Sequence, residues 1–166
     1  VSIRSLKRFV ADLERELPRP SPPSGAARGP AVAVIGSGPA GLTAAYDLRL
    51  AGLPVTVFEA EAEPGGMLRY GITPYRLPRE ILAAEIGVLE RAGVEIRTGV
   101  RLGTDVELDE LRGRGYKAVV LAVGAQVGRK LGVPGEEGVR AVQDALTFLR
   151  RVNGGDLRSA GRNVLV

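Results

Sequence analysis

The sequence contains no cysteine and no histidine among its 166 residues. Without cysteine these residues offer no disulfide chemistry and no thiolate-ligated cluster, and without histidine they lack the commonest general base. Zinc sites of the usual kind need one or both residue types and are excluded as well. We therefore expect no catalytic side chain and no metal ligand here, so that any chemistry comes from a cofactor or from residues outside this chain.

Aromatic residues, long apolar runs and blocks of one charge are also scarce. Aromatic residues make up 4% of the chain, and no apolar run approaches the roughly 20 residues of a membrane-spanning helix. No secretory signal peptide is recognisable, so the expected location is the cytoplasm. The net charge of +4 arises mostly in residues 1–30, which carry six Lys/Arg and three Asp/Glu. This pattern favours neither a nucleic-acid partner nor a membrane partner.

The first 30 residues differ in composition from the rest. Apolar residues at helical spacing between 2 and 17 predict an amphipathic helix that docks on another surface. Residues 18–30 hold five of the eleven prolines and show no periodicity, which predicts a stiff linker. We therefore expect a leading helix at 1–17, a Pro-rich linker at 18–30 and a folded domain at 31–160.

From residue 31 onward, short apolar runs alternate with helical patterns. The expected strands are 31–35, 55–58, 94–98 and 116–123, and the expected helices are 39–52, 79–92, 107–113 and 141–152. Such alternation is typical of an α/β fold with a Rossmann-like, doubly wound parallel sheet.

A glycine-rich turn follows the first expected strand and opens the first helix of this domain. Its residues are Gly36, Ser37, Gly38, Pro39, Ala40 and Gly41. The first glycine permits the tight turn, the second lets phosphates approach the backbone, and the third allows close packing of helix on strand. The helix N-terminus then faces the negative charge, so the segment predicts binding of a dinucleotide pyrophosphate.

Glu59 ends the second expected strand, 18 residues after Gly41. A carboxylate at this place can accept hydrogen bonds from the ribose hydroxyls of an adenosine. It would also repel a 2′-phosphate, which disfavours NADP in this site. An exposed strand-end glutamate is the alternative interpretation.

The loop over residues 63–78 favours FAD over NAD as the dinucleotide. It opens with Gly65 and Gly66, which permit close backbone approach to a ligand, and its prolines predict an extended path. Arg76 can present a planar fork to a phosphate or to a flavin carbonyl. A surface arginine is the alternative for Arg76.

Several motifs together resemble one flavoprotein family. They are GSGPAG, FEAEAEPGGMLRYGI, YRLPREIL, AGVEIRTGV, YKAVVLAVGA and GVPGEEGV, in this order. The sequence is similar to the FAD-binding half of the glutamate synthase small (beta) subunit family, a group that includes the related domain of dihydropyrimidine dehydrogenase. Pro74 stands one place later than the proline of the commoner family pattern.

The resemblance implies further FAD contacts beside the glycine turn and Glu59. Gly66 and Met67 would line the ribityl and isoalloxazine end, and Arg76 would reach the cofactor. Val100 or Leu102 would present backbone to the adenine, and Gly124 would pass beneath the pyrophosphate.

The resemblance also implies domains and partners beyond these residues. Residues 1–17 resemble the final helix of the family's iron–sulfur domain, and residues 161–166 resemble the first strand of its NAD(P)H-binding domain. The parent enzyme would pass electrons from NAD(P)H through FAD to iron–sulfur centres and a large electron-accepting subunit. This chain alone would then lack the NAD(P)H site and be inactive with NAD(P)H.

Other interpretations stay open. Ferredoxin/adrenodoxin reductase-like enzymes share much of this scaffold, and amine-oxidase-like flavoproteins share the glycine turn but not the YRLP pattern. An inactive flavin- or nucleotide-binding assembly module is the non-enzymatic alternative. For residues 161–166 the less favoured alternative is an ordinary final strand of the same domain.

Overall fold

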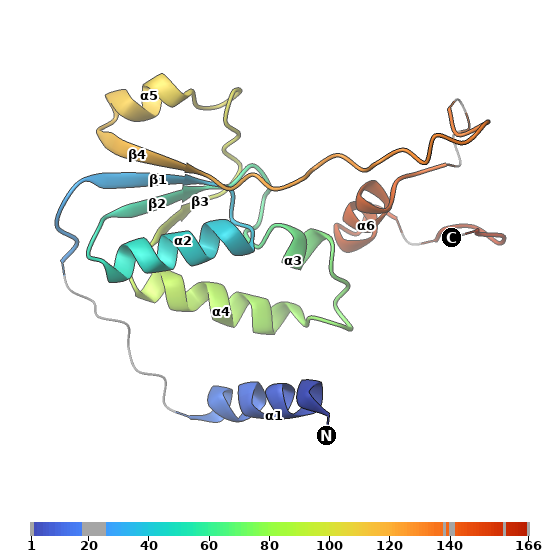
Figure 1. Ribbon diagram of the computed structural model, residues 1–166, viewed down its shortest axis with the longest axis horizontal. Coiled ribbons are helices and arrows are strands. Elements are labelled where there is room, and N and C mark those ends of the chain that lie inside the picture. Colours follow the sequence, from blue (N-terminus) through green and yellow to red (C-terminus); the bar gives the residue numbers. More distant parts are fainter. Residues whose placement is uncertain (1, 18–25, 138, 140–141, 158, 166) are drawn as a thin grey trace.

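The computed structural model describes residues 2–17, 26–137, 139, 142–157 and 159–165. Its centre is one sheet of four parallel strands in the order β3-β2-β1-β4 (Figure 1). The strands are β1 (Ala31–Ile35), β2 (Val55–Phe58), β3 (Glu95–Arg97) and β4 (Tyr116–Leu121). Every neighbouring pair runs parallel, which confirms the expected Rossmann-like α/β class.

Helices follow the strands in the alternation that the sequence predicts. They are α1 (Ile3–Glu16), α2 (Pro39–Leu50), α3 (Met67–Tyr70), α4 (Arg79–Arg91), α5 (Leu108–Gly113) and α6 (Ala145–Asn153). Figure 1 shows α2 and α4 against one face of the sheet and α5 against the other. The sheet is therefore covered on both faces, as a parallel sheet requires.

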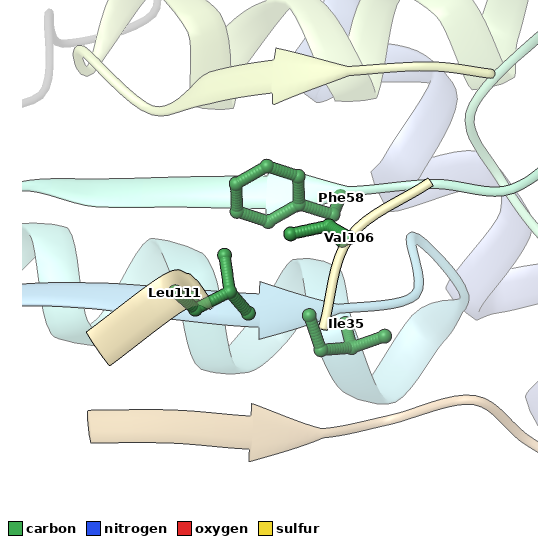
Figure 2. Close-up of a cluster of buried hydrophobic side chains, with 5 residues drawn as sticks. Ile35, Phe58, Val106 and Leu111 are labelled. Atoms are coloured by element: carbon green, nitrogen blue, oxygen red, sulfur yellow. The ribbon is translucent and has the colours of Figure 1, made fainter. Parts of the chain in front are cut away.

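The core forms two layers because successive strand side chains point to opposite faces. Val34 packs with Ala45 of α2 on one face, whereas Ile35 packs with Leu111 of α5 on the other. Figure 2 shows this second cluster, in which Phe58 and Val106 fill the space between strand and helix. Each such fully buried side chain contributes about 1.5–3 kcal/mol of hydrophobic stabilisation, which fixes the strand ends that carry the site.

Several element bounds are tighter than expected. β3 and β4 stop within their expected ranges because parallel pairing ends at Phe58↔Arg97 and at Ile35↔Leu121. α6 begins at Ala145 rather than at 141, because the Asp144 carboxylate accepts hydrogen bonds from two amides of the first turn at 3.1 Å each. Asp144 is thus the N-cap. Residue 141 of the expected helix lies outside the described residues.

The loop over residues 63–78 is not extended, and this expectation was wrong. Gly65 and Gly66 take positive φ angles of 126° and 51°, and the chain turns directly into α3. The Gly66 carbonyl accepts hydrogen bonds from the amides of Arg69 (3.0 Å) and Tyr70 (2.9 Å). Two consecutive glycines with positive φ angles thus start a helical turn. Its four residues are too few to show helical periodicity in the sequence.

The two ends of the chain lie outside the sheet. The leading helix forms as expected over Ile3–Glu16, and its apolar stripe is exposed, with Leu6 at 53% and Val10 at 60%. Residues 18–25 of the expected linker lie outside the described residues. Residues 161–165 form no strand, because a strand needs a hydrogen-bonded neighbour and no described residue pairs with them. The proposed domain limits remain predictions.

Candidate functional site

The glycine-rich turn connects β1 to α2 at the carboxyl edge of the sheet. Gly36 has a φ of 103°, and a Cβ there would lie 2.5 Å from the Ala122 carbonyl oxygen. A Cβ on Gly41 would lie 1.9 Å from the Gly36 carbonyl oxygen. Glycine is therefore required at these two positions by the fold itself, which needs the tight turn and the close packing of α2.

Gly38 is different. Its φ of −70° suits any residue, and a Cβ built on it would meet nothing within 4 Å. It is the N-cap of α2 and lines a cavity of about 360 Å³ at the carboxyl ends of the strands. The backbone leaves this space open where the first-turn amides of a helix of 12 residues point, which is the arrangement that receives an anion.

Most of the predicted site residues line this cavity. Gly36, Ser37, Gly38, Pro39 and Ala40 come from the turn, Glu59 from the end of β2, Gly66 and Met67 from the start of α3, Val100 and Leu102 from the segment after β3, and Gly124 from the segment after β4. The carboxyl ends of neighbouring parallel strands meet at one edge, and the structure brings these residues together there.

Three predicted residues do not line the cavity. Gly41 lies under the turn. A Cβ added to Gly65 would lie 3.0 Å from the Leu82 side chain, and the Gly65 amide donates to Ser37 Oγ at 3.0 Å. Arg76 is exposed, and its guanidinium lies 5.9 Å from the centre of the Tyr75 ring. The structure therefore does not bring Arg76 to the cavity, because α3 and the turn after it carry the chain away from this edge.

Glu59 is buried and its carboxylate faces the glycine turn, not the solvent. It is 6% exposed. Its Oε2 accepts hydrogen bonds from the amide of Ser37 at 2.9 Å and from Ser37 Oγ, and its Oε1 accepts one from the amide of Glu61 at 2.9 Å. Three donors compensate the buried charge. A carboxylate has about four acceptor positions, so one remains on Oε1 for a ribose hydroxyl.

The segment after β3 is tied to Glu59 as well. The Val100 amide donates to the Glu59 carbonyl at 2.8 Å, so this amide is already used and is not free for an adenine. Leu102 lies two residues further on and forms a short parallel bridge with Val106. The predicted adenine contact through backbone thus falls to Leu102 or to the Val100 carbonyl.

Sequence reasoning missed part of the cavity wall. Ala122, Val123 and Gln126 follow β4, Glu61 follows β2, Arg101 follows Val100, and Tyr70 and Arg150 come from α3 and α6. The rule that strand ends meet at one edge could have found the residues after β4. No sequence signal places Arg150 there, because its position depends on where α6 docks.

Two polar side chains at the cavity wall, Arg150 and Tyr70, have partners in neighbouring segments. Arg150 Nη1 lies 2.9 Å from Glu61 Oε1, with both side chains about one-third exposed. Burial raises the pKa of the Tyr70 phenol, whose hydroxyl donates to the Glu63 carbonyl at 3.4 Å.

Among the described residues, no cluster of three or more acidic, Cys or His side chains could hold a metal ion. None of the described helices has the length and apolarity needed to cross a bilayer.

A family comparison agrees with this geometry. The sequence model of the pyridine nucleotide-disulphide oxidoreductase family matches residues 30–166. These residues contain no cysteine, so they contribute no redox-active disulphide to such chemistry.

Three curated relatives resemble the chain over most of its length. The glutamate synthase [NADPH] small chain of Mycobacterium tuberculosis is 45% identical over 77% of this chain and 26% of its own. The beta subunit of NADP(+)-dependent formate dehydrogenase from Moorella thermoacetica is 43% identical over 92% of this chain and 25% of its own. The beta subunit of NADPH-Fe(3+) oxidoreductase from Geobacter sulfurreducens is 38% identical over 100% and 25%. The chain thus spans about a quarter of the length of these relatives.

A solved structure shares the fold. FprA from Mycobacterium tuberculosis, in complex with NADPH, superposes with a TM-score of 0.68 at 30% identity, covering 76% of this chain and 29% of its own. The predicted resemblance to the glutamate synthase small-subunit group is confirmed by the sequence relatives. The chain therefore belongs to the FAD-dependent pyridine nucleotide-disulphide oxidoreductase family.

Proposed function

We propose that this chain is the FAD-binding portion of an NAD(P)H-dependent flavoprotein oxidoreductase. The observation that carries the proposal is the open space in front of Gly38. The fold has no need of glycine at this position, whereas a phosphate that approaches the backbone does. Glu59, Gly66 and Met67 line the same cavity as Gly38.

Each part of FAD has residues in this chain that would hold it. The turn from Gly36 to Ala40 and the N-terminus of α2 would hold the pyrophosphate. Glu59 Oε1 would accept a ribose hydroxyl, and the backbone near Leu102 would face the adenine. Gly66 and Met67 would lie toward the flavin end, with Gly124 under the pyrophosphate.

FAD, when bound, would supply hydride and one-electron transfer chemistry. The side chains of this chain would bind and orient the cofactor and exclude water from its adenosine half. The chain contains no histidine and no cysteine, so it offers neither the usual general base nor a thiolate nucleophile to the reaction.

The NAD(P)H site, the iron–sulfur centres and an electron-accepting subunit would lie outside these residues. The names of the relatives support a partner subunit, since they are small or beta subunits. We propose that the 166 residues alone do not turn over NAD(P)H, and that the whole protein acts in the cytoplasm.

Among the relatives we favour the glutamate synthase small-subunit type. The distinctive stretch from Gly65 to Pro78, which includes GGMLRYGI and RLP, supports it. A ferredoxin/adrenodoxin reductase-like flavoprotein is the second candidate, because such enzymes resemble much of this scaffold. The choice between the two candidates concerns the electron acceptor.

The test is a ligand titration of the purified, flavin-free 166-residue chain. We expect FAD to bind and ADP to compete with it, because the proposed site would hold the adenosine diphosphate half. FMN, which lacks that half, should bind at least about tenfold more weakly, equivalent to about 1.4 kcal/mol. A chain that binds no FAD, or that binds FMN as tightly as FAD, would contradict the proposal.

A further inference from the structure

α6 comes back to the cavity after a long irregular segment. Figure 1 shows it beside α3 at the carboxyl ends of the strands, and the two helices contact each other. None of its side chains is fully buried. A helix without buried apolar side chains is held weakly by packing, so its polar contacts decide where it lies.

Two polar side chains anchor α6. Asn153 Nδ2 donates to the Tyr70 carbonyl at 2.8 Å, which ties the end of α6 to α3. Arg150 Nη1 donates to Glu61 Oε1 at 2.9 Å, and its Nη2 donates to Gln126 Oε1. The Arg150 guanidinium therefore joins three segments, namely α6, the residues after β2 and the residues after β4.

All three of these side-chain partners lie at the cavity. Arg150, Glu61 and Gln126 each contribute to its wall. Arg150 Nε is buried and has no hydrogen-bond partner, so the guanidinium is held by its two outer nitrogens alone. A fork that uses both outer nitrogens fixes the geometry of its two acceptors relative to each other.

We propose that Arg150 is a positioning residue that retains the bound dinucleotide. It holds α6 against the loops after β2 and β4, so that the cofactor leaves only when this contact opens. The inference rests on the proposed function. It assigns no catalytic role to Arg150, which acts through Glu61 and Gln126.

The test measures the rate at which FAD dissociates from the loaded 166-residue chain after rapid dilution, followed by recovery of FAD fluorescence. Arg150→Gln should raise this rate about five- to tenfold, because it removes a charge-assisted fork. The matched control is Arg151→Gln on the same helix, which loses one exposed hydrogen bond to Gln143. It should stay within about twofold of the unchanged chain.

A charge reversal separates positioning from general damage to the fold. Glu61→Arg and Arg150→Glu should each raise the dissociation rate, and the double variant should bring it back below that of either single variant. A merely structural role would lower the melting temperature of the free chain and leave the rate unmoved.

The outcomes separate this inference from the proposed function. If the unchanged chain retains no FAD, both the proposed function and the role of Arg150 are overturned. If it retains FAD and Arg150→Gln dissociates within about twofold of it, the proposed function stands and the role of Arg150 is overturned. Failure of the reversed pair to restore retention also overturns it.

Discussion

The backbone amide of Ser37 donates a hydrogen bond to the carboxylate of Glu59 at 2.9 Å. The Ser37 hydroxyl donates to the same oxygen and accepts a hydrogen bond from the Gly65 amide at 3.0 Å. One fully buried serine thus ties together the glycine turn after β1, the end of β2 and the double glycine before α3. These are the three segments that the proposed FAD site needs in a fixed arrangement.

Replacing this hydroxyl should destabilise the domain. Ser37→Ala leaves the buried Gly65 amide without an acceptor and removes one donor from Glu59, so we expect the free energy of unfolding to fall by about 1–3 kcal/mol. Urea denaturation measures it. Ser5→Ala on the exposed face of α1 is the control and should change it by less than about 0.5 kcal/mol. If the two substitutions lowered the free energy of unfolding equally, Ser37 would not tie the three segments together as described.

The turn glycine Gly36 should tolerate no side chain. Gly36→Ala places a Cβ 2.5 Å from the Ala122 carbonyl oxygen at a φ of 103°, so strain and displacement of β4 should reduce stability by about 2 kcal/mol or more. Thermal unfolding checks this expectation. A variant with the unchanged melting temperature would show that the turn is not held as described.

Arg76 should be dispensable for cofactor binding. Its side chain is exposed beside Tyr75 and away from the cavity, so Arg76→Ala should change the FAD dissociation constant by less than about twofold, or about 0.4 kcal/mol. Fluorescence titration measures it. A loss of tenfold or more, about 1.4 kcal/mol, would instead support the contact that the family resemblance implies.

An ion pair at the edge of the sheet contributes to folding stability in a pH-dependent way. The hydrogen bond from Arg97 lowers the pKa of Glu95, and Thr56 Oγ1 adds a second at 3.0 Å. Because the folded-state pKa is depressed, this stability is present above the unfolded-state pKa and is lost as pH falls through the folded value.

The measurement compares the unchanged chain with Glu95→Gln in urea at several pH values. The stability gap should be greatest near neutral pH and shrink below about pH 4.5. Both side chains are about half exposed, so solvent screening keeps the gap below about 1 kcal/mol. A gap that widens in acid would reverse the assigned sign.

The fold could be predicted from the sequence because its signals are local. β1 and β2 begin and end where the apolar runs do, and the glycine turn follows β1 directly. Glu59 followed from its place at the end of the second strand. Val100, Leu102 and Gly124 came from the family resemblance. The close approach at Gly65 and Gly66 followed from the double glycine, whereas Met67 came from the family resemblance.

The remainder depends on unusual backbone geometry or on contacts between distant segments. α3 begins after two glycines with positive φ angles. Arg76 does not line the cavity because the chain turns away at α3. The inward orientation of Glu59 depends on Ser37, 22 residues earlier. Arg150 reaches Glu61 across 89 positions, and no periodicity encodes such a contact.

The most direct test of the FAD site is the dissociation constant for FAD of Gly38→Ala, measured beside its melting temperature. The added Cβ meets nothing within 4 Å and the φ of −70° is allowed, so stability should change by less than about 1 kcal/mol, the difference between glycine and alanine at an N-cap. FAD should bind at least about tenfold more weakly, because the methyl group fills the approach of the pyrophosphate. Gly113→Ala, also open but away from the cavity, is the matched control and should bind FAD normally. A Gly38→Ala chain that folds and binds FAD as tightly as the control would contradict the account.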